Sequence, residues 1–151
     1  MSEREGGAGA GAGAGAGERA IDRELEERAV AAQPLAYAPY SRFPVGAAVR
    51  MGGKTYEGVN VESASFPLTV CAERNAIGAA VRDGARRLEA VVVCSNASPP
   101  SAPCGGCRQV LLEFAADPAA VTITAVNPQG ERRTWMLAEL IPHGFSGREL
   151  P

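Results

Sequence analysis

Leu88-Glu89-Ala90-Val91-Val92-Val93-Cys94, residues 88–94, sets three consecutive valines among apolar neighbours. A short run rich in β-branched residues predicts a buried strand. The next stretch, 95–103, carries three prolines and is expected to be a loop. Residues 70–81 and 104–115 have helical patterns on either side, and 121–126 is a second β-branched run. The centre of the chain therefore predicts helix, strand, helix and strand.

Upstream of this unit, the sequence predicts a helix and a hairpin. Residues 18–32 are rich in Ala, Glu, Leu and Arg, with apolar residues at helical spacing. Pro34 should end this helix, because proline removes an amide donor and clashes with the preceding turn. Residues 45–51 and 54–59 predict two strands, and the Gly-Gly pair between them is a hairpin signal.

The C-terminal part of the sequence predicts a turn, a strand and a short helix. Residues 127–130, Asn-Pro-Gln-Gly, predict a turn. Residues 132–135 predict a final strand, and 136–140 a short helix. We expect an α/β fold, a three-layer αβα sandwich around a mixed five-stranded sheet.

Residues 6–17 contain only glycine and alanine. Such a tract has no large apolar side chains to offset the entropy lost on ordering. The sequence thus predicts a disordered tail, residues 1–17, followed by one domain, residues 18–151.

The overall composition excludes several classes of function. The chain has 151 residues, a hydrophobic fraction of 46% and a net charge of −2. The slight acidity argues against a nucleic-acid partner, and no apolar run is long enough for a membrane span. The first residues are charged and lack an apolar run, so we expect a cytoplasmic, reducing location. Cysteines in that setting are more often metal ligands or redox groups than disulfides.

Three cysteines predict a metal site. Cys104 and Cys107 are three residues apart at the start of a predicted helix, so both sulfurs can face one ion. Cys71 lies near the start of another predicted helix. Three protein ligands leave one corner of a zinc tetrahedron open, which is typical of a catalytic Zn²⁺. Two helix N-termini would offset the negative charge of three thiolates.

Two neighbours of Cys71 have predicted roles. Glu73 would lie beside the metal and act as a general acid and base, although glutamate in a first helical turn is also common for its effect on the helix dipole. Arg74 is a candidate for donating hydrogen bonds to thiolate sulfur. It would then reduce the negative charge around the zinc.

Other interpretations of these cysteines remain open. A structural zinc site would need Cys94 as the fourth ligand, but Cys94 ends a predicted buried strand, where cysteine is usually a small hydrophobic residue. The pair at 104 and 107 could instead be a redox pair, although the proline-rich loop before it is unusual for one. We rank the catalytic zinc site above both.

A zinc-deaminase signature consists of a His or Cys, a nearby Glu and a later Pro-Cys-x-x-Cys. The chain contains Cys71-Ala72-Glu73 and Pro103-Cys104-Gly105-Gly106-Cys107. From about residue 29 to its C-terminus it resembles the small, homotetrameric, zinc-dependent cytidine deaminases. The stretches that carry the resemblance are 36–41 (AYAPYS), 43–48 (FPVGAA), 58–62 (GVNVE), 68–76 (LTVCAERNA) and 103–110 (PCGGCRQV).

The resemblance implies a role for each residue of the signature. The three cysteines would hold Zn²⁺, and Glu73 would take a proton from the attacking water, pass it to N3 of the pyrimidine and help ammonia leave C4. The backbone of Ala72 would contact the base carbonyl, and the Ala102 carbonyl would lie near the leaving amine.

The resemblance also implies substrate contacts elsewhere. Asn60 and Glu62 match an Asn-x-Glu pair that binds the ribose hydroxyls, and alternation along a strand would place both on one face. Phe43 matches a phenylalanine that packs on the base. Phe145 matches one that reaches the neighbouring subunit's site, although ordinary core packing remains an alternative for both.

The leading hypothesis is therefore deamination of cytidine and deoxycytidine to the uridine forms in pyrimidine salvage, by a homotetramer. One alternative is a deaminase of a cytosine-containing antibiotic such as blasticidin S. A nucleic-acid deaminase would generally show a histidine ligand and a basic surface. A purely structural zinc protein would not need Glu73.

Overall fold

The computed structural model describes residues 16–151, with side chains from residue 23 onward. The tail predicted for residues 1–17 lies outside this range, except for its last two residues, which begin the first helix. The principal elements in chain order are α1 (Ala16–Ala32), β1 (Gly46–Met51), β2 (Lys54–Val59), α2 (Ala72–Arg82), β3 (Leu88–Cys94), α3 (Gly105–Phe114), β4 (Thr122–Val126), β5 (Arg132–Met136) and α4 (Leu137–Leu140).

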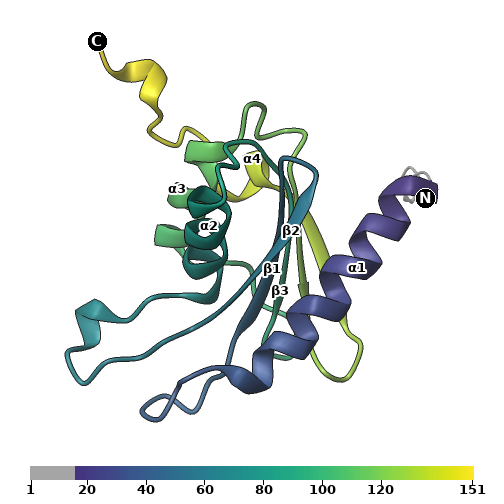
Figure 1. Cartoon of the computed structure of the whole chain (residues 1–151), viewed down its shortest axis with the longest axis vertical. Coiled ribbons are helices and arrows are strands. Elements are labelled where there is room, and N and C mark those ends of the chain that lie inside the picture. The colour runs from purple at the N-terminus through teal and green to yellow at the C-terminus, as the bar shows by residue number, and fades with distance from the viewer. Residues whose placement is uncertain (1–15) are drawn as a thin grey trace, which may run out of the picture.

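The strands form one mixed five-stranded sheet in the order β2-β1-β3-β4-β5. β3 and β4 are parallel, and the other neighbouring strands are antiparallel. Figure 1 shows α1 on one face of the sheet and α2, α3 and α4 on the other. The predicted three-layer αβα sandwich is confirmed. Within the described part of the chain, no helix combines the length and apolarity that a membrane span requires.

β3 divides its side chains between the two layers, because successive residues of a strand point to opposite faces. Val91 and Val93 belong to the core beneath α2 and α3. Ala90, Val92 and Cys94 belong to a smaller core beneath α1. The run that sequence identified as a buried strand is thus apolar on both faces because helices cover both faces.

Local sequence signals account for the element ends. Gly52 and Gly53 both have positive φ, +57° and +76°, which suits the tight turn between β1 and β2. Pro34 lies in a short 3₁₀ helix, Gln33–Leu35, directly after α1. α2 begins at Ala72 rather than at residue 70, because Val70 pairs with Val61 in an isolated bridge.

Gly58 lets β2 approach α2 closely. A Cβ atom built at Gly58 would lie 2.3 Å from the Ala72 carbonyl oxygen and 2.4 Å from the Ala76 nitrogen, both backbone atoms. Such contacts cannot be relieved by moving a flexible side chain. Glycine at this position therefore fixes the distance between the strand and the beginning of the helix.

We predict that Gly58→Ala lowers the free energy of unfolding by about 3 kcal/mol, since overpacking against rigid backbone forces the helix away from the sheet. The measurement is urea unfolding followed by circular dichroism. Gly78→Ala is the matched control, because Gly78 lies in the exposed part of α2 with nothing within 4 Å of its added Cβ. The control should be neutral or more stable by up to about 1 kcal/mol. Equal stability of the two variants would contradict the prediction.

Candidate active site

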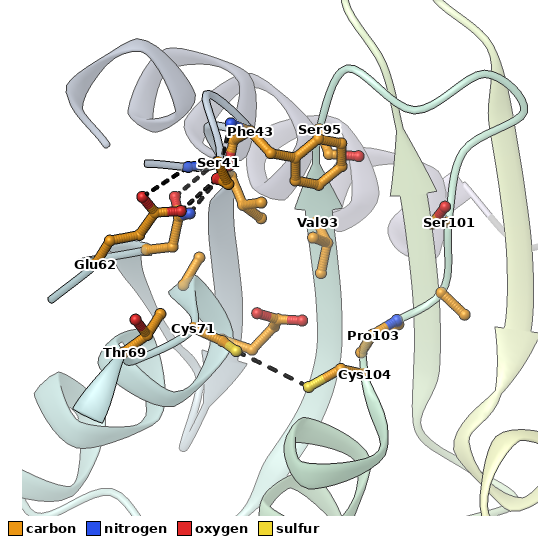
Figure 2. Close-up of a pocket in the computed structure, with 15 residues that line it drawn as sticks. Ser41, Phe43, Glu62, Thr69, Cys71, Val93, Ser95, Ser101, Pro103 and Cys104 are labelled. Atoms are coloured by element: carbon orange, nitrogen blue, oxygen red, sulfur yellow. Dashed lines mark hydrogen bonds between the residues drawn. The ribbon is translucent and has the colours of Figure 1, made fainter. Parts of the chain in front are cut away.

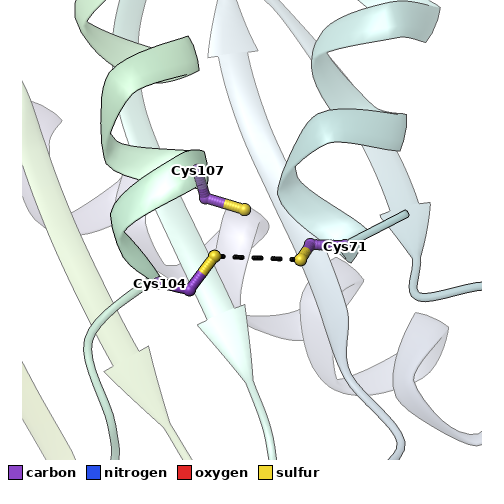
Figure 3. A group of neighbouring side chains, drawn as sticks. All are labelled: Cys71, Cys104 and Cys107. Carbon is purple, nitrogen blue, oxygen red and sulfur yellow. Dashed lines mark hydrogen bonds between the residues drawn. The ribbon is translucent and has the colours of Figure 1, made fainter. Parts of the chain in front are cut away.

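The predicted metal ligands lie at the N-termini of two helices. Cys71 is the N-cap residue of α2, and Cys104 is the N-cap residue of α3. Cys107 lies within the first turn of α3, so its sulfur faces the same side as that of Cys104. Figure 3 shows the three sulfurs converging between the two helices. The positive ends of both helix dipoles therefore point toward the sulfur group.

The geometry of the sulfurs fits a zinc ion. The Sγ atoms of Cys71, Cys104 and Cys107 all lie within 4.8 Å of one another. Cys71 Sγ and Cys104 Sγ are 3.9 Å apart. Zn–S bonds of about 2.3 Å in a tetrahedron place sulfurs about 3.8 Å apart. The cluster can thus hold Zn²⁺ with little rearrangement.

Cys94 cannot serve as a fourth ligand. It is fully buried among the residues beneath α1, on the opposite face of the sheet from the helices that carry the other cysteines. Its environment is apolar, and burial raises the pKa of its thiol. Successive residues of β3 point to opposite faces of the sheet, and Cys94 points away from the other three cysteines. The four-cysteine structural site considered from sequence is therefore excluded.

The surroundings of Cys71 favour its thiolate form. The pKa of Cys71 is lowered to about 5, chiefly by the hydrogen bond from the Cys107 thiol and also by Arg74. The pKa of Cys107 is raised by that same hydrogen bond, because Cys107 is the donor. Arg74 Nη2 lies 3.9 Å from Cys71 Sγ and donates to the Thr69 carbonyl at 2.9 Å. The Thr69 carbonyl thus helps to hold the guanidinium beside the Cys71 sulfur.

A cavity of about 480 Å³ opens beside the cysteines, at the carboxyl end of β3 (Figure 2). Its volume lies in the range usual for small-molecule sites. Its lining includes two of the sulfurs and five of the predicted substrate-contact residues. The lining residues are Ser41, Phe43, Val45, Asn60, Glu62, Thr69, Cys71, Ala72, Glu73, Val93, Ser95, Ser101, Ala102, Pro103 and Cys104.

Glu73 reaches the cavity from the first turn of α2 and is only 5% exposed. Its pKa is raised, first by desolvation and also by the negative charge of Cys71. A carboxyl group in this environment can hold a proton more readily than a solvated one. It therefore has the character of a group that both accepts and returns protons.

Asn60 and Glu62 follow the end of β2, and both side chains brace the loop of residues 40–45. Asn60 Oδ1 accepts from the Val45 amide at 2.8 Å, and its Nδ2 donates to the Phe43 carbonyl at 3.0 Å. Glu62 accepts hydrogen bonds from the backbone amide of Tyr40 and from both the amide and the hydroxyl of Ser41. The predicted substrate-binding pair thus has a structural function as well.

Ala72 and Ala102 both line the cavity beside the sulfurs. The Ala72 amide is the first of α2, and amides at a helix N-terminus have no acceptor within the helix. It is therefore suited to donate to a substrate carbonyl. Ala102 lies in the loop before α3 and lines the same cavity.

Phe145 does not join this cavity within its own chain. It is 60% exposed, and its carbonyl accepts from Gln109 Nε2 at 2.7 Å, on the outer side of α3. Its predicted contact with a neighbouring subunit's site stays a prediction.

Sequence reasoning assigned no role to four polar residues of the cavity wall: Ser41, Thr69, Ser95 and Ser101. Short hydroxyl side chains in loops are common and form no distinctive pattern. Ser41 did lie in a stretch that carried the family resemblance, 36–41, but spacing alone did not reveal the partner of its hydroxyl.

Comparison with protein families supports the sequence assignment. Residues 19–124 match the cytidine and deoxycytidylate deaminase zinc-binding region. A curated cytidine deaminase from Halalkalibacterium halodurans is 40% identical over 132 residues, which cover 86% of this chain and 98% of that protein.

Solved structures give the same result. The crystal structure of cytidine deaminase from Burkholderia pseudomallei superposes with a TM-score of 0.76 at 42% identity, covering 82% of this chain and 98% of that one. Cytidine deaminase from Mycobacterium tuberculosis superposes with a TM-score of 0.69 at 38% identity, covering 82% and 95% of the respective chains.

We predict one zinc per chain in purified protein, measured by atomic emission spectroscopy. Cys107→Ala should lose at least about 10-fold in zinc affinity, because only two sulfurs remain to hold the ion. Cys94→Ala is the control and should retain full zinc content, since Cys94 faces the other layer. Undiminished zinc binding in Cys107→Ala would contradict the three-sulfur site.

Proposed function

The chain belongs to the cytidine and deoxycytidylate deaminase family, and we propose that it hydrolyses the C4 amino group of cytidine and deoxycytidine, giving uridine or deoxyuridine and ammonia. The observation that carries this proposal is a cluster of three sulfurs, two of which line one nucleoside-sized cavity together with a buried carboxyl group. A structural zinc site would not need a proton-transferring group at its side.

Glu73 carries the proton transfers in this mechanism. Cys71, Cys104 and Cys107 would hold Zn²⁺, which would supply the Lewis acidity that lowers the pKa of the attacking water. The Glu73 carboxylate accepts a proton from the attacking water and donates it to N3 of the pyrimidine. After the water oxygen has bonded to C4, Glu73 takes the remaining proton of that hydroxyl and passes it to the C4 amine, so that the C4=O bond forms as the C4–N bond breaks and ammonia leaves. Burial supports this role, because it raises the pKa of Glu73.

The cavity wall would bind the base from two sides. Phe43 would pack on the pyrimidine ring, and the free amide of Ala72 would donate to the base carbonyl. The Ala102 carbonyl would accept from the departing amine. Together these contacts orient C4 toward the sulfur cluster.

Glu62 and Asn60 would bind the sugar. Glu62 Oε2 already accepts from two backbone amides, whereas Oε1 accepts from one donor of the described chain, the Ser41 hydroxyl. A carboxylate oxygen can accept about two hydrogen bonds, so Oε1 retains room for one sugar hydroxyl. Binding through a single hydroxyl is compatible with either ribose or deoxyribose. A carboxylate beside the sugar also disfavours the negative charge of a nucleotide phosphate.

A homotetramer and a place in pyrimidine salvage belong to the same proposal. Exposed aromatic side chains lie at the cavity mouth and beside it: Phe43 lines the cavity, and Tyr40 and Phe66 line a neighbouring hollow that shares Ser41, Glu62 and Thr69 with it. Clusters of this kind usually mark an interaction surface. In the proposed assembly a neighbouring copy covers them, and its Phe145 reaches the site. Free thiol ligands require a reducing compartment, which supports a cytoplasmic location.

The decisive experiment measures ammonia release from cytidine, deoxycytidine, CMP and blasticidin S. We expect turnover of both nucleosides, and at least about 100-fold lower kcat/KM for CMP, because its phosphate would be repelled by Glu62. Activity on CMP alone would overturn the nucleoside assignment, and activity on blasticidin S alone would favour the antibiotic deaminase.

Glu73→Gln is the matched control for the chemistry in this assay. The amide keeps the size of the side chain but cannot accept or return the proton. The variant should therefore keep its zinc while kcat falls at least about 1,000-fold. Full turnover in a zinc-loaded variant would rule out the proton-transfer role.

We predict a tetramer by light scattering, with Phe66→Glu shifted toward smaller species because the introduced charge would be buried between copies. Val30→Glu offers a control at an exposed position of α1, away from the cavity mouth, and should leave the mass unchanged. A fully active monomer would contradict the proposed assembly.

A further inference from the structure

The Ser41 hydroxyl connects two parts of the cavity. Ser41 Oγ donates to Glu62 Oε1 and accepts from the Phe43 amide at 3.0 Å. The Ser41 amide also donates to Glu62 Oε2 at 3.1 Å. Figure 2 shows Ser41 between the Glu62 carboxylate and Phe43. One short side chain thus links the proposed sugar-binding group to the backbone of the proposed base-packing group.

Glu62 depends on these contacts for a defined position. It lies beyond the end of β2, next to the exposed Val61, so regular strand pairing does not hold its side chain. The Tyr40 amide is its other donor, at 2.9 Å to Oε2. An unrestrained glutamate side chain would lose rotamer freedom on binding each substrate molecule. Three donors from adjacent residues remove that freedom before the substrate arrives.

Among the residues that the structure describes, only the Ser41 hydroxyl donates a hydrogen bond to Oε1, the oxygen that retains room for a sugar hydroxyl. The two backbone amides bind Oε2 and would remain after any side-chain substitution at position 41. The hydroxyl therefore determines how Oε1 is directed, while the amides determine where the carboxylate lies.

The conformation of the turn brings the serine into place. Arg42, between Ser41 and Phe43, has a φ of +55°, which is uncommon for a residue with a side chain. This reversal lets the Phe43 amide return to Ser41 Oγ. The turn is therefore held by the same hydroxyl that meets Glu62.

We propose that Ser41 is a positioning residue for nucleoside binding, whose hydroxyl orients the Glu62 carboxylate toward the sugar hydroxyl. This inference rests on the proposed function and extends it to a residue that does not itself need to touch the substrate. The hydrogen bond from this hydroxyl is also the largest cause of the lowered pKa of Glu62. It therefore favours the ionised carboxylate, which can accept a hydrogen bond from the sugar.

The first test compares Ser41→Ala with the wild-type enzyme on two substrates. For cytidine we expect KM to rise about 10-fold with kcat within about 2-fold, because a hydrogen bond to a charged group is lost before chemistry begins. For 2′,3′-dideoxycytidine, which lacks the hydroxyl that Glu62 would bind, KM should differ by less than about 2-fold between the two proteins, because Asn60 still holds the Phe43 carbonyl and the Val45 amide. Ser41→Thr retains the hydroxyl at an exposed position and should restore KM for cytidine to within about 3-fold.

A double-mutant cycle separates this role from a general loosening of the turn. In a Glu62→Ala background, Ser41→Ala should change KM for cytidine by less than about 2-fold, because a residue that acts through the Glu62 carboxylate has nothing left to position. A 10-fold effect that persists in that background would overturn the proposal. So would an equal rise in KM for dideoxycytidine, or a loss confined to kcat.

The two proposals fail in different ways. A wild-type enzyme with no activity on cytidine or deoxycytidine would refute the proposed function itself. A wild-type enzyme that is active, but whose Ser41→Ala variant matches it on every substrate, would refute only the role of Ser41. Thermal unfolding of each variant checks that the fold persists.

Discussion

The meeting of two helix N-termini on one face of the sheet is the constraint on which the site depends. α2 presents Cys71 and α3 presents Cys104 and Cys107, so the sulfur cluster exists only when both helices are correctly packed. The close contact of Gly58 with the first turns of α2 sets one side of this arrangement. On the other side, Arg108 bonds the Pro103 carbonyl at 2.7 Å and the Leu140 carbonyl at 3.0 Å. Helix packing and metal binding are thus consequences of the same contacts.

The cavity lies between the N-termini of two packed helices and a loop that side-chain hydrogen bonds hold in place. The sulfurs and Glu73 lie at the ends of helices packed on the sheet, where the backbone is held by many hydrogen bonds. The opposite wall is the loop of residues 40–45, which has no strand partner along most of its length. Asn60 and Glu62 hold it through side-chain hydrogen bonds. The groups proposed to carry out the chemistry are therefore placed by secondary structure, and the groups proposed to recognise the substrate are placed by side-chain hydrogen-bond networks.

Much of this could be predicted from sequence, because the strongest signals are local. The apolar run at 88–94 and the Gly-Gly turn identified strands, and the pair at 104 and 107 identified a helix start with two ligands. The resemblance to a known family then supplied residues of the cavity wall. The role proposed for Ser41 was not predicted, because it depends on a hydrogen bond to a residue 21 positions away in the sequence. The exposure of Phe145 was also not predictable from local sequence, because it depends on the path of the chain after α4.

By itself, the sequence determined the order of the elements, the chemistry of the three thiols and the presence of a carboxyl group beside them, since these depend on residue type and short-range spacing. Tertiary structure alone decided that Cys94 faces the opposite layer, that Glu73 is buried with a raised pKa, and that Glu62 is held by Ser41. Each of these depends on the distance between segments remote in the chain, which is set when the helices and the loop pack against the sheet.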